Sequence, residues 1–425
     1  MIVDRKNILK IDWTLILIYI SLAGFGIGNI LSSSISGEEF KLFNLSTLYG
    51  KQLIFAIFSF IIAFIILYVD VKFFEKFSSI IYVFSILTLL SLFLIGKTVN
   101  GAQSWISFGD FNFQPSEFVK ITVALAISKY ISDYETDLKK VNDQIKLFLI
   151  ILIPFSIIIF QNDTGTALVF LSLFLVLYRE GISEKYISIL FLIIILAVVT
   201  LKFSLITSSI SSILIVGLYY LLKRKRNKLV GFIITCTICL TACFVTKLTY
   251  EKVLKNHQRN YIKVWLKLED DPKKIKEMGK TILYNLNQSK KAISSGGIFG
   301  KGYLKGTRTM GNFVPAQHTD YIFSTIGEEW GFLGSTFIII LYNILIFRIL
   351  ILSESQKNKF SRVFGYSTAA ILFIHFLINI GMVIGLTPTI GIPLPFLSYG
   401  GSSFIAFTII LFIFIRLDAN KINEW

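Results

Sequence analysis

Long apolar runs that contain few charged residues dominate the sequence. About twelve of them approach the ~20 residues that a transmembrane helix needs. Hydrophobic residues make up 54% of the 425 residues and charged residues 16%, against roughly 45–50% and about 25% in soluble domains. This composition excludes a soluble multidomain enzyme and a disordered chain. We therefore expect an all-α polytopic membrane protein forming one integral membrane domain over residues 1–425.

Charged residues or clusters of Gly, Asn and Ser bound each run. In chain order the runs are Trp13–Ile30, Gln52–Val69, Ser78–Ile95, Pro115–Ile131, Leu147–Phe160, Thr166–Tyr178, Tyr186–Thr200, Leu205–Leu222, Leu229–Thr246, Phe323–Leu350, Phe364–Leu386 and Ser403–Leu417.

Lys and Arg are unevenly distributed among the short loops. One set of loops holds Arg5, Lys6, Lys10, Lys72, Lys76, Lys139, Lys140, Lys146, Arg179, Lys185, Lys223, Arg224, Lys225, Arg226, Lys228, Arg348, Lys357, Lys359, Arg362, Arg416 and Lys421, whereas the other holds only Lys41, Lys51, Lys97 and Lys202. Because cytoplasmic loops are enriched in these residues, both termini are expected in the cytoplasm, which requires an even number of spans. The net charge of +16 fits loops beside anionic lipid better than nucleic-acid binding.

One non-membrane segment, residues 247–321, is much longer than a plain connector and is expected on the outer face. Within it, Asp271–Lys290 carries charges and apolar residues at helical spacing, which predicts an amphipathic helix along the membrane surface. A solvated tether is the alternative. Downstream, Ser295–Gly302 is rich in Gly and contains Lys301, a composition that suits close approach to a phosphate-like group.

Few ionisable residues lie in or beside the apolar runs, where they normally face a partner or a wet cavity. Glu117 and Lys120 are three residues apart on one helix face, so they form an ion pair or hold an anionic substrate group. Asp163 lies between two runs and is either a helix cap or a site residue. His318, Thr319 and Asp320 open directly into an apolar run, where Asp320 is a cap or part of a site.

Three of the seven prolines lie in a Pro/Gly-rich segment over residues 387–403. Irregular backbone at membrane depth survives only where it is buried in protein or lines a cavity, which favours a re-entrant site element over a tight turn. Cys236, Cys239 and Cys243 lie on one face of an apolar run without His or carboxylates, so we interpret them as packing residues. His375 is interpreted as a satisfied core residue.

These segments resemble the SEDS proteins (shape, elongation, division and sporulation). The matching segments, in family order, are Trp105–Ile106, Gln114–Lys120, Gln161–Ala167, Gln288–Thr307, Pro315–Gly331 and Asn379–Ser403. The forms of Gly300–Thr307 and Gly391–Gly401 resemble the RodA branch more than the division paralogue FtsW. The resemblance implies a core of ten transmembrane helices. Because three runs occupy the place of one, residues 184–228 are expected to be an inserted hairpin.

The resemblance also implies an activity: a peptidoglycan glycosyltransferase of the bacterial cytoplasmic membrane that polymerises lipid II at the outer face for cell elongation and shape. It implies a class B penicillin-binding protein and elongation-complex membrane proteins as partners, and Asp320 as the catalytic residue. Residues expected to contact substrate are Lys120, Glu117, Asp163, Lys290, Arg259, His318, Thr319 and Ser398.

The chemistry needs a base for the acceptor hydroxyl and positive charge for the departing pyrophosphate. We assign the base to Asp320, and the positive charge to Lys120, Lys290 and Arg259. A divalent cation, Mg or Mn, held by Asp320 or Asp163 would serve the same purpose. A transporter of lipid-linked precursors, a division or sporulation paralogue and another polyprenyl-linked glycan polymerase or ligase stay open as alternatives.

Overall fold

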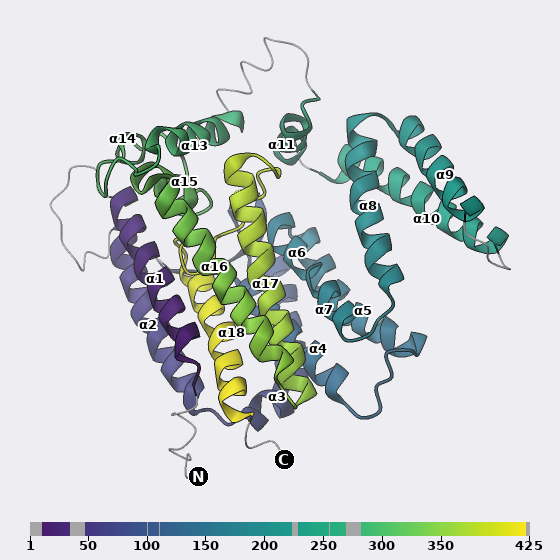
Figure 1. Ribbon diagram of the computed structural model, residues 1–425, viewed down its shortest axis with the longest axis horizontal. Coiled ribbons are helices and arrows are strands. Elements are labelled where there is room, and N and C mark those ends of the chain that lie inside the picture. The colour runs from purple at the N-terminus through teal and green to yellow at the C-terminus, as the bar shows by residue number, and fades with distance from the viewer. Residues whose placement is uncertain are drawn as a thin grey trace. The chain divides into compact units, whose positions relative to one another are not determined.

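The computed structural model describes residues 11–34, 47–99, 101–109, 111–222, 228–254, 256–268 and 282–421 (Figure 1). The chain forms two compact units, where the sequence led us to expect one domain. Unit 1 comprises Met1–Ile182, Asn285–Gly385 and Thr389–Trp425, and unit 2 comprises Ser183–Tyr284 and Leu386–Pro388. The predicted helix Asp271–Lys290 falls largely outside the described residues, as do Lys41 and the basic residues at 5–10 and 223–226.

Helices make up most of unit 1. They are α1 (Trp13–Ser34), α2 (Leu48–Tyr68), α3 (Val71–Ile95), α4 (Pro115–Ser132), α5 (Val141–Phe160), α6 (Thr164–Phe170), α7 (Leu173–Arg179), α13 (Ile282–Gly296), α14 (Thr307–Met310), α15 (Ile322–Glu329), α16 (Gly331–Glu354), α17 (Lys359–Ile384) and α18 (Gly401–Asn420). Unit 2 contains α8 (Glu184–Lys202), α9 (Leu205–Leu222), α10 (Lys228–Leu248), a short π-helix (Thr249–Val253) and α11 (Asn256–Leu266).

The prediction of an all-α polytopic membrane protein is confirmed. Among the described residues, nine helices are long and apolar enough to cross a membrane, and Thr164–Arg179 and Leu205–Leu221 are shorter apolar segments. The fourth predicted run corresponds to α4, which begins at Pro115, a favoured first residue of a helix. Each of the twelve predicted runs overlaps one or two helices.

A small antiparallel sheet was not predicted. Its strands are β1 (Lys97–Val99), β2 (Ala102–Phe108) and β3 (Phe111–Phe113), in the order β1-β2-β3. The backbone N–H of Gln103 in β2 donates to Gln161 O, 2.9 Å away, at the end of α5. The sheet therefore joins α3 to α4 and touches the segment that leads to Asp163.

Two predicted continuous runs are broken helices. Thr166–Tyr178 divides into α6 and α7, and Phe323–Leu350 divides into α15 and α16. At the second break Gly331 has φ +63°, and a Cβ there would lie 2.3 Å from Gly300 N. The break exists because the glycine-rich loop packs directly on the backbone at this point, which hydropathy does not reveal.

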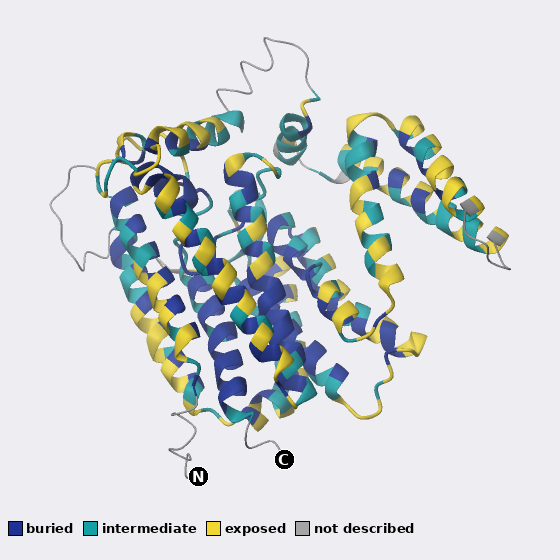
Figure 2. Cartoon of the chain, in the orientation of Figure 1, coloured by how far each residue is buried: buried dark blue, intermediate teal, exposed yellow. Residues whose placement is uncertain are grey.

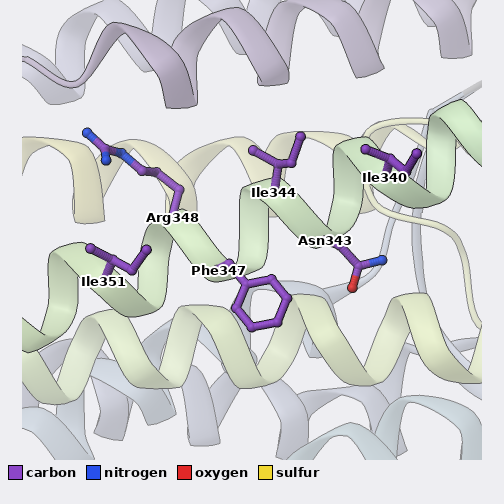
Figure 3. A pocket seen from close by; sticks show the side chains of 6 residues that line it. All are labelled: Ile340, Asn343, Ile344, Phe347, Arg348 and Ile351. Atoms are coloured by element: carbon purple, nitrogen blue, oxygen red, sulfur yellow. The ribbon is translucent and has the colours of Figure 1, made fainter.

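α18 is the most enclosed of the described candidate spans, with 83% of its apolar window buried. Figure 2 shows it dark blue along nearly its whole length, whereas α2 and α16 each have a yellow face. One exposed face of α16 carries mostly apolar side chains around a shallow pocket of about 400 Å³ (Figure 3). Its lining residues are Ile340, Asn343, Ile344, Phe347, Arg348 and Ile351. Exposed apolar surface of this kind suits contact with lipid chains.

Ion pairs join helix ends at the end of unit 1 where α1 begins. Arg348 near the end of α16 lies 2.5 Å from Asp12, which precedes α1. Arg362 in the first turn of α17 lies 2.8 Å from Glu180, which follows α7. These contacts place the start of α1, the end of α7, the end of α16 and the start of α17 at one end of the bundle.

The helices of unit 2 have a small apolar cluster of their own. Its buried members are Leu196, Val216, Cys239 and Cys243, with Cys236 packed against them. The three cysteines are free thiols, and their packing confirms the interpretation of a structural role. Because these helices pack on one another, they form a compact unit separate from the main bundle.

Candidate active site

Asp320 lies in the turn before α15, next to the Pro/Gly-rich segment. The side chain is half-buried. Its Oδ2 atom is 3.2 Å from the position that a Cβ would occupy on Gly391, whose φ is +77°. This φ is strained for other residues, and a side chain there would press on the carboxylate, so glycine at this position leaves room for the carboxylate of Asp320.

Asp163 immediately precedes α6 and lies in the same region as Asp320. Its Oδ1 accepts a hydrogen bond from Thr166 N at 3.1 Å, the helix cap that the sequence allowed, and its Oδ2 accepts one from Gln114 Nε2 at 2.9 Å. A Cβ on Gly165 would lie 3.3 Å from Gly391 O. The Pro/Gly-rich segment is thus in contact with the loops that carry both Asp163 and Asp320.

The electrostatics of Asp320 follow from this environment. Burial, and to a smaller extent the nearby charge of Asp163, together raise the pKa of its carboxyl group to about 6. At neutral pH the carboxylate is still largely ionised but holds a proton more tightly than an exposed aspartate. This is the property that a general base requires.

His318 and Thr319 are held by the Pro/Gly-rich segment through backbone contacts. Tyr399 N donates to His318 O at 2.8 Å, and Ser398 Oγ donates to Thr319 O at 2.7 Å. Ser398 Oγ also accepts a hydrogen bond from Leu394 N at 2.8 Å. The hydroxyl group of Ser398 therefore has both a donor and an acceptor partner within the protein. Burial lowers the pKa of His318, which favours the neutral imidazole.

Glu117 and Lys120 form a buried ion pair on α4, each only 2% exposed. Lys120 Nζ is 2.8 Å from Glu117 Oε2 and 3.0 Å from His375 Nε2, and it lies over the ring of Phe407. His375 Nδ1 is in turn 3.1 Å from Pro393 O. The ammonium group therefore has internal partners, which favours structural pairing, and His375 is the satisfied core residue that we predicted.

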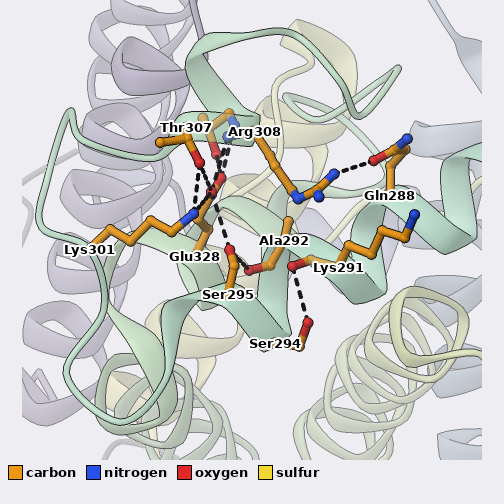
Figure 4. Close-up of polar contacts among 10 residues, drawn as sticks. Gln288, Lys291, Ala292, Ser294, Ser295, Lys301, Thr307, Arg308 and Glu328 are labelled. Carbon is orange, nitrogen blue, oxygen red and sulfur yellow. Dashed lines mark hydrogen bonds and ion pairs between the residues drawn. The ribbon is translucent and has the colours of Figure 1, made fainter.

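The glycine-rich loop folds around a carboxylate of the protein itself (Figure 4). Glu328 accepts hydrogen bonds from Lys301 Nζ at 2.7 Å, Arg308 N at 3.0 Å and Thr309 N at 2.9 Å. Burial opposes its ionisation, but these donors outweigh burial and hold the pKa of Glu328 below its ordinary value. Of these donors, Lys301 belongs to the loop Ser295–Gly302, and the two backbone N–H groups belong to α14. Lys301 is therefore paired with an internal carboxylate, and contact of the loop with a phosphate group stays a prediction.

Two further predicted substrate contacts lie elsewhere in the chain. Lys290 on α13 is exposed, and its Nζ approaches Gly385 at the C-terminal end of α17. Arg259 lies on α11 in unit 2, where its Nε donates to Leu254 O at 2.8 Å. The structure thus groups Asp320, Asp163 and Ser398 in one place and leaves the role of these two cations as a prediction.

Sequence reasoning gave no role to three residues of this region. Gln114 binds Asp163, Gly391 faces Asp320, and Asn379 on α17 donates to the backbone of Asp320 at 2.9 Å. Asn379 is a fully buried amide within an apolar helix. That polarity is a recognisable signal for a functional or structural contact.

The carboxylates of Asp163 and Asp320 are the acidic side chains available here for a divalent cation. No cluster of three or more His, Cys, Asp and Glu side chains suited to a metal occurs in the described part of the chain. Mg²⁺ is commonly held by one or two carboxylates, with water and substrate phosphates completing its shell. Two neighbouring like charges in a half-buried setting fit a cation of that kind.

The chain matches the family model FtsW/RodA/SpoVE, described as a cell cycle protein, over residues 13–210 and 205–423. The chain belongs to this family, the SEDS proteins. Among its relatives, the peptidoglycan glycosyltransferase RodA of Treponema pallidum is 30% identical, covering 94% of this chain and 95% of the relative. The peptidoglycan glycosyltransferase MrdB of Escherichia coli is 32% identical over 78% of this chain and 75% of its own length.

Solved structures show the same SEDS fold. A chain from a structure of a peptidoglycan synthase complex superposes with a TM-score of 0.71 at 23% identity, covering 97% of this chain and 99% of that one. The rod shape determining protein RodA of Thermus thermophilus superposes with a TM-score of 0.62 at 21% identity, covering 97% of each chain.

Proposed function

We propose that this SEDS protein is a peptidoglycan glycosyltransferase of the RodA branch. It polymerises lipid II into glycan strands at the outer face of the bacterial cytoplasmic membrane. Two relatives that bear that enzyme name, matched over 95% and 75% of their own lengths, support the activity. A probable FtsW of Wigglesworthia glossinidia is 31% identical, so identity does not separate the branches. The branch assignment instead rests on the forms of Gly300–Thr307 and Gly391–Gly401.

The proposed topology has both termini in the cytoplasm. The end of the bundle that carries the Arg348–Asp12 and Arg362–Glu180 pairs then faces the cytoplasm, in agreement with the enrichment of basic residues there. Asp320 lies at the outer face of the membrane in this topology. Residues 387–403 lie there too, as a re-entrant element. In this scheme α8 and α9 form an inserted hairpin added to a core of ten helices, which preserves the even number of spans.

The proposed mechanism uses Asp320 as a general base. A sugar hydroxyl of the acceptor attacks the anomeric carbon of the donor, the bond from that carbon to the lipid-linked pyrophosphate breaks, and the hydroxyl proton moves to Asp320. The single observation that carries this assignment is the half-buried carboxylate of Asp320 beside Asp163. Burial and the charge of Asp163 raise the pKa of Asp320 to about 6 and leave it largely ionised at neutral pH.

The growing charge on the pyrophosphate needs a positive partner. Lys290 is the exposed candidate in unit 1, whereas the partners of Lys120 direct its charge inward. A divalent cation at Asp163 and Asp320 would supply Lewis-acid stabilisation of the leaving group. We propose Mg or Mn in that role.

The proposed partner is a class B penicillin-binding protein that crosslinks the strands, together with membrane proteins of the elongation complex. The similarity of fold to a chain of a peptidoglycan synthase complex is consistent with such a partner.

Purified full-length protein incubated with labelled lipid II tests the function. We expect glycan polymer from the wild type and none from Asp320→Asn, with both proteins inserted and folded. Polymer from Asp320→Asn at near the wild-type rate would show that Asp320 is not the base. Movement of lipid II across a vesicle membrane without polymer would support the transporter alternative.

A further inference from the structure

Three successive backbone carbonyls around Asp320 are each held by a donor from the last part of the chain. His318 O accepts from Tyr399 N at 2.8 Å, and Thr319 O accepts from the hydroxyl of Ser398 at 2.7 Å. The third carbonyl, Asp320 O, accepts from Asn379 Nδ2 at 2.9 Å. The turn that carries the carboxylate is thus tied to the Pro/Gly-rich segment at His318 and Thr319 and to α17 at Asp320.

Asn379 differs from the other two donors because it joins two backbones with one amide group. Its Nδ2 also donates to Ile392 O at 2.7 Å. Ile392 follows Gly391, whose Cβ position lies 3.2 Å from Asp320 Oδ2. A side-chain amide carries two N–H donors, and here they reach the two segments that meet beside the carboxylate.

The orientation of the amide follows from its surroundings. Both neighbours are carbonyl oxygens, so the reverse orientation would place the amide oxygen against two acceptors. Asn379 is fully buried, and no donor among the residues that the structure describes reaches its Oδ1 atom. Burial of an amide with an unused acceptor is unfavourable, by about 1–3 kcal/mol. An aliphatic side chain at this position would avoid that cost, so the amide is not explained by packing alone.

We propose that Asn379 is a positioning residue for catalysis, fixing the carboxylate of Asp320 against Gly391 by bridging the carbonyls of Asp320 and Ile392. This inference rests on the proposed function. Asn379 does not touch substrate; it restricts where the base can lie when the acceptor hydroxyl arrives. Displacement of a catalytic group by about 1 Å can lower a rate by about 100-fold.

The test uses purified full-length protein, labelled lipid II and two substitutions. Asn379→Ala removes the amide and both of its N–H donors. Asn379→Asp keeps the shape of the side chain but replaces the NH₂ group with an oxygen atom, so it carries no N–H donor. We expect kcat per folded protein to fall by about 10- to 100-fold in both variants, with KM for lipid II within about twofold of the wild type. A role confined to folding would lower the amount of folded protein and its melting temperature but would leave kcat per folded protein unchanged.

Asn343→Ala is the matched control. Asn343 lies on an exposed face of α16, where its amide donates to Ile339 O within its own helix at 2.8 Å. This variant should keep the wild-type kcat. If Asn379→Ala does not give folded protein, Asn379→Asp decides the question. Wild-type kcat in a folded Asn379 variant, or a rise in KM without a fall in kcat, would overturn the inference.

The same assay separates this inference from the proposed function. If the wild-type protein makes no polymer, the proposed function fails. If Asp320→Asn makes polymer at the normal rate, the assignment of Asp320 as the base fails. If Asp320→Asn is inactive while the Asn379 variants are fully active, only the positioning role fails.

Discussion

Asp320→Asn should stabilise the protein while abolishing its activity. Burial and Asp163 raise the pKa of Asp320 from 3.8 to about 6. This shift corresponds to a free-energy cost of about 3 kcal/mol for the ionised carboxylate in the folded protein. The side chain is only half-buried, so solvent screening reduces this to about 1–2 kcal/mol. The neutral amide of Asn carries no such penalty.

The sign of the pH dependence follows from proton binding. The folded protein holds the Asp320 proton more tightly than the unfolded chain, so the contribution of Asp320 to stability falls as pH rises from about 4 to about 6 and then levels off. Asn does not titrate. The variant should therefore melt higher than the wild type at about pH 7.5, by about 2–6 °C, and the difference should disappear near pH 4.

Thermal unfolding of both detergent-purified proteins over this pH range provides the measurement, with polymerisation of labelled lipid II as the activity readout. A variant less stable than the wild type at about pH 7.5, or a difference that does not change with pH, would refute the reasoning about burial. A divalent cation beside Asp320 would lower its pKa. The melts are therefore run with chelator and repeated with added Mg.

Three further predictions concern the groups around the site. Single neutralisation of Glu117 or Lys120 leaves a buried charge without its partner and should destabilise the fold by about 3–5 kcal/mol; recovery of melting temperature and activity in the charge-swapped double variant would favour structural pairing, and no recovery would favour direct phosphate contact. Glu328→Ala removes the acceptor of the glycine-rich loop, so limited proteolysis should cut that loop faster than in the wild type; unchanged cleavage would contradict its organising role. If Asp163 and Asp320 hold a cation, chelator should lower the polymerisation rate and Mg or Mn should restore it, whereas a chelator-insensitive rate would exclude that cation.

Local patterns in the sequence were enough to predict the helices and to select several residues of the candidate site. Apolar runs predict spans because each span must satisfy its own hydrogen bonds in lipid. Asp320, Asp163 and the Glu117–Lys120 pair were selected because ionisable groups are rare in such surroundings. The breaks at Leu171 and Gly331 and the small sheet were missed, since backbone packing and not hydropathy determines them.

What the sequence by itself determined is therefore the class of protein, the placement of its helices, its family and the residues that carry charge. Only the tertiary structure decided which of those residues meet. It brought Asp320 and Asp163 together through Gly391, paired Lys301 of the glycine-rich loop with Glu328, and placed Asn379 between two backbones. Hydropathy and motif spacing report the environment of one segment. Contacts between residues far apart in the chain depend on how closely backbones approach, which the packing of the whole bundle sets.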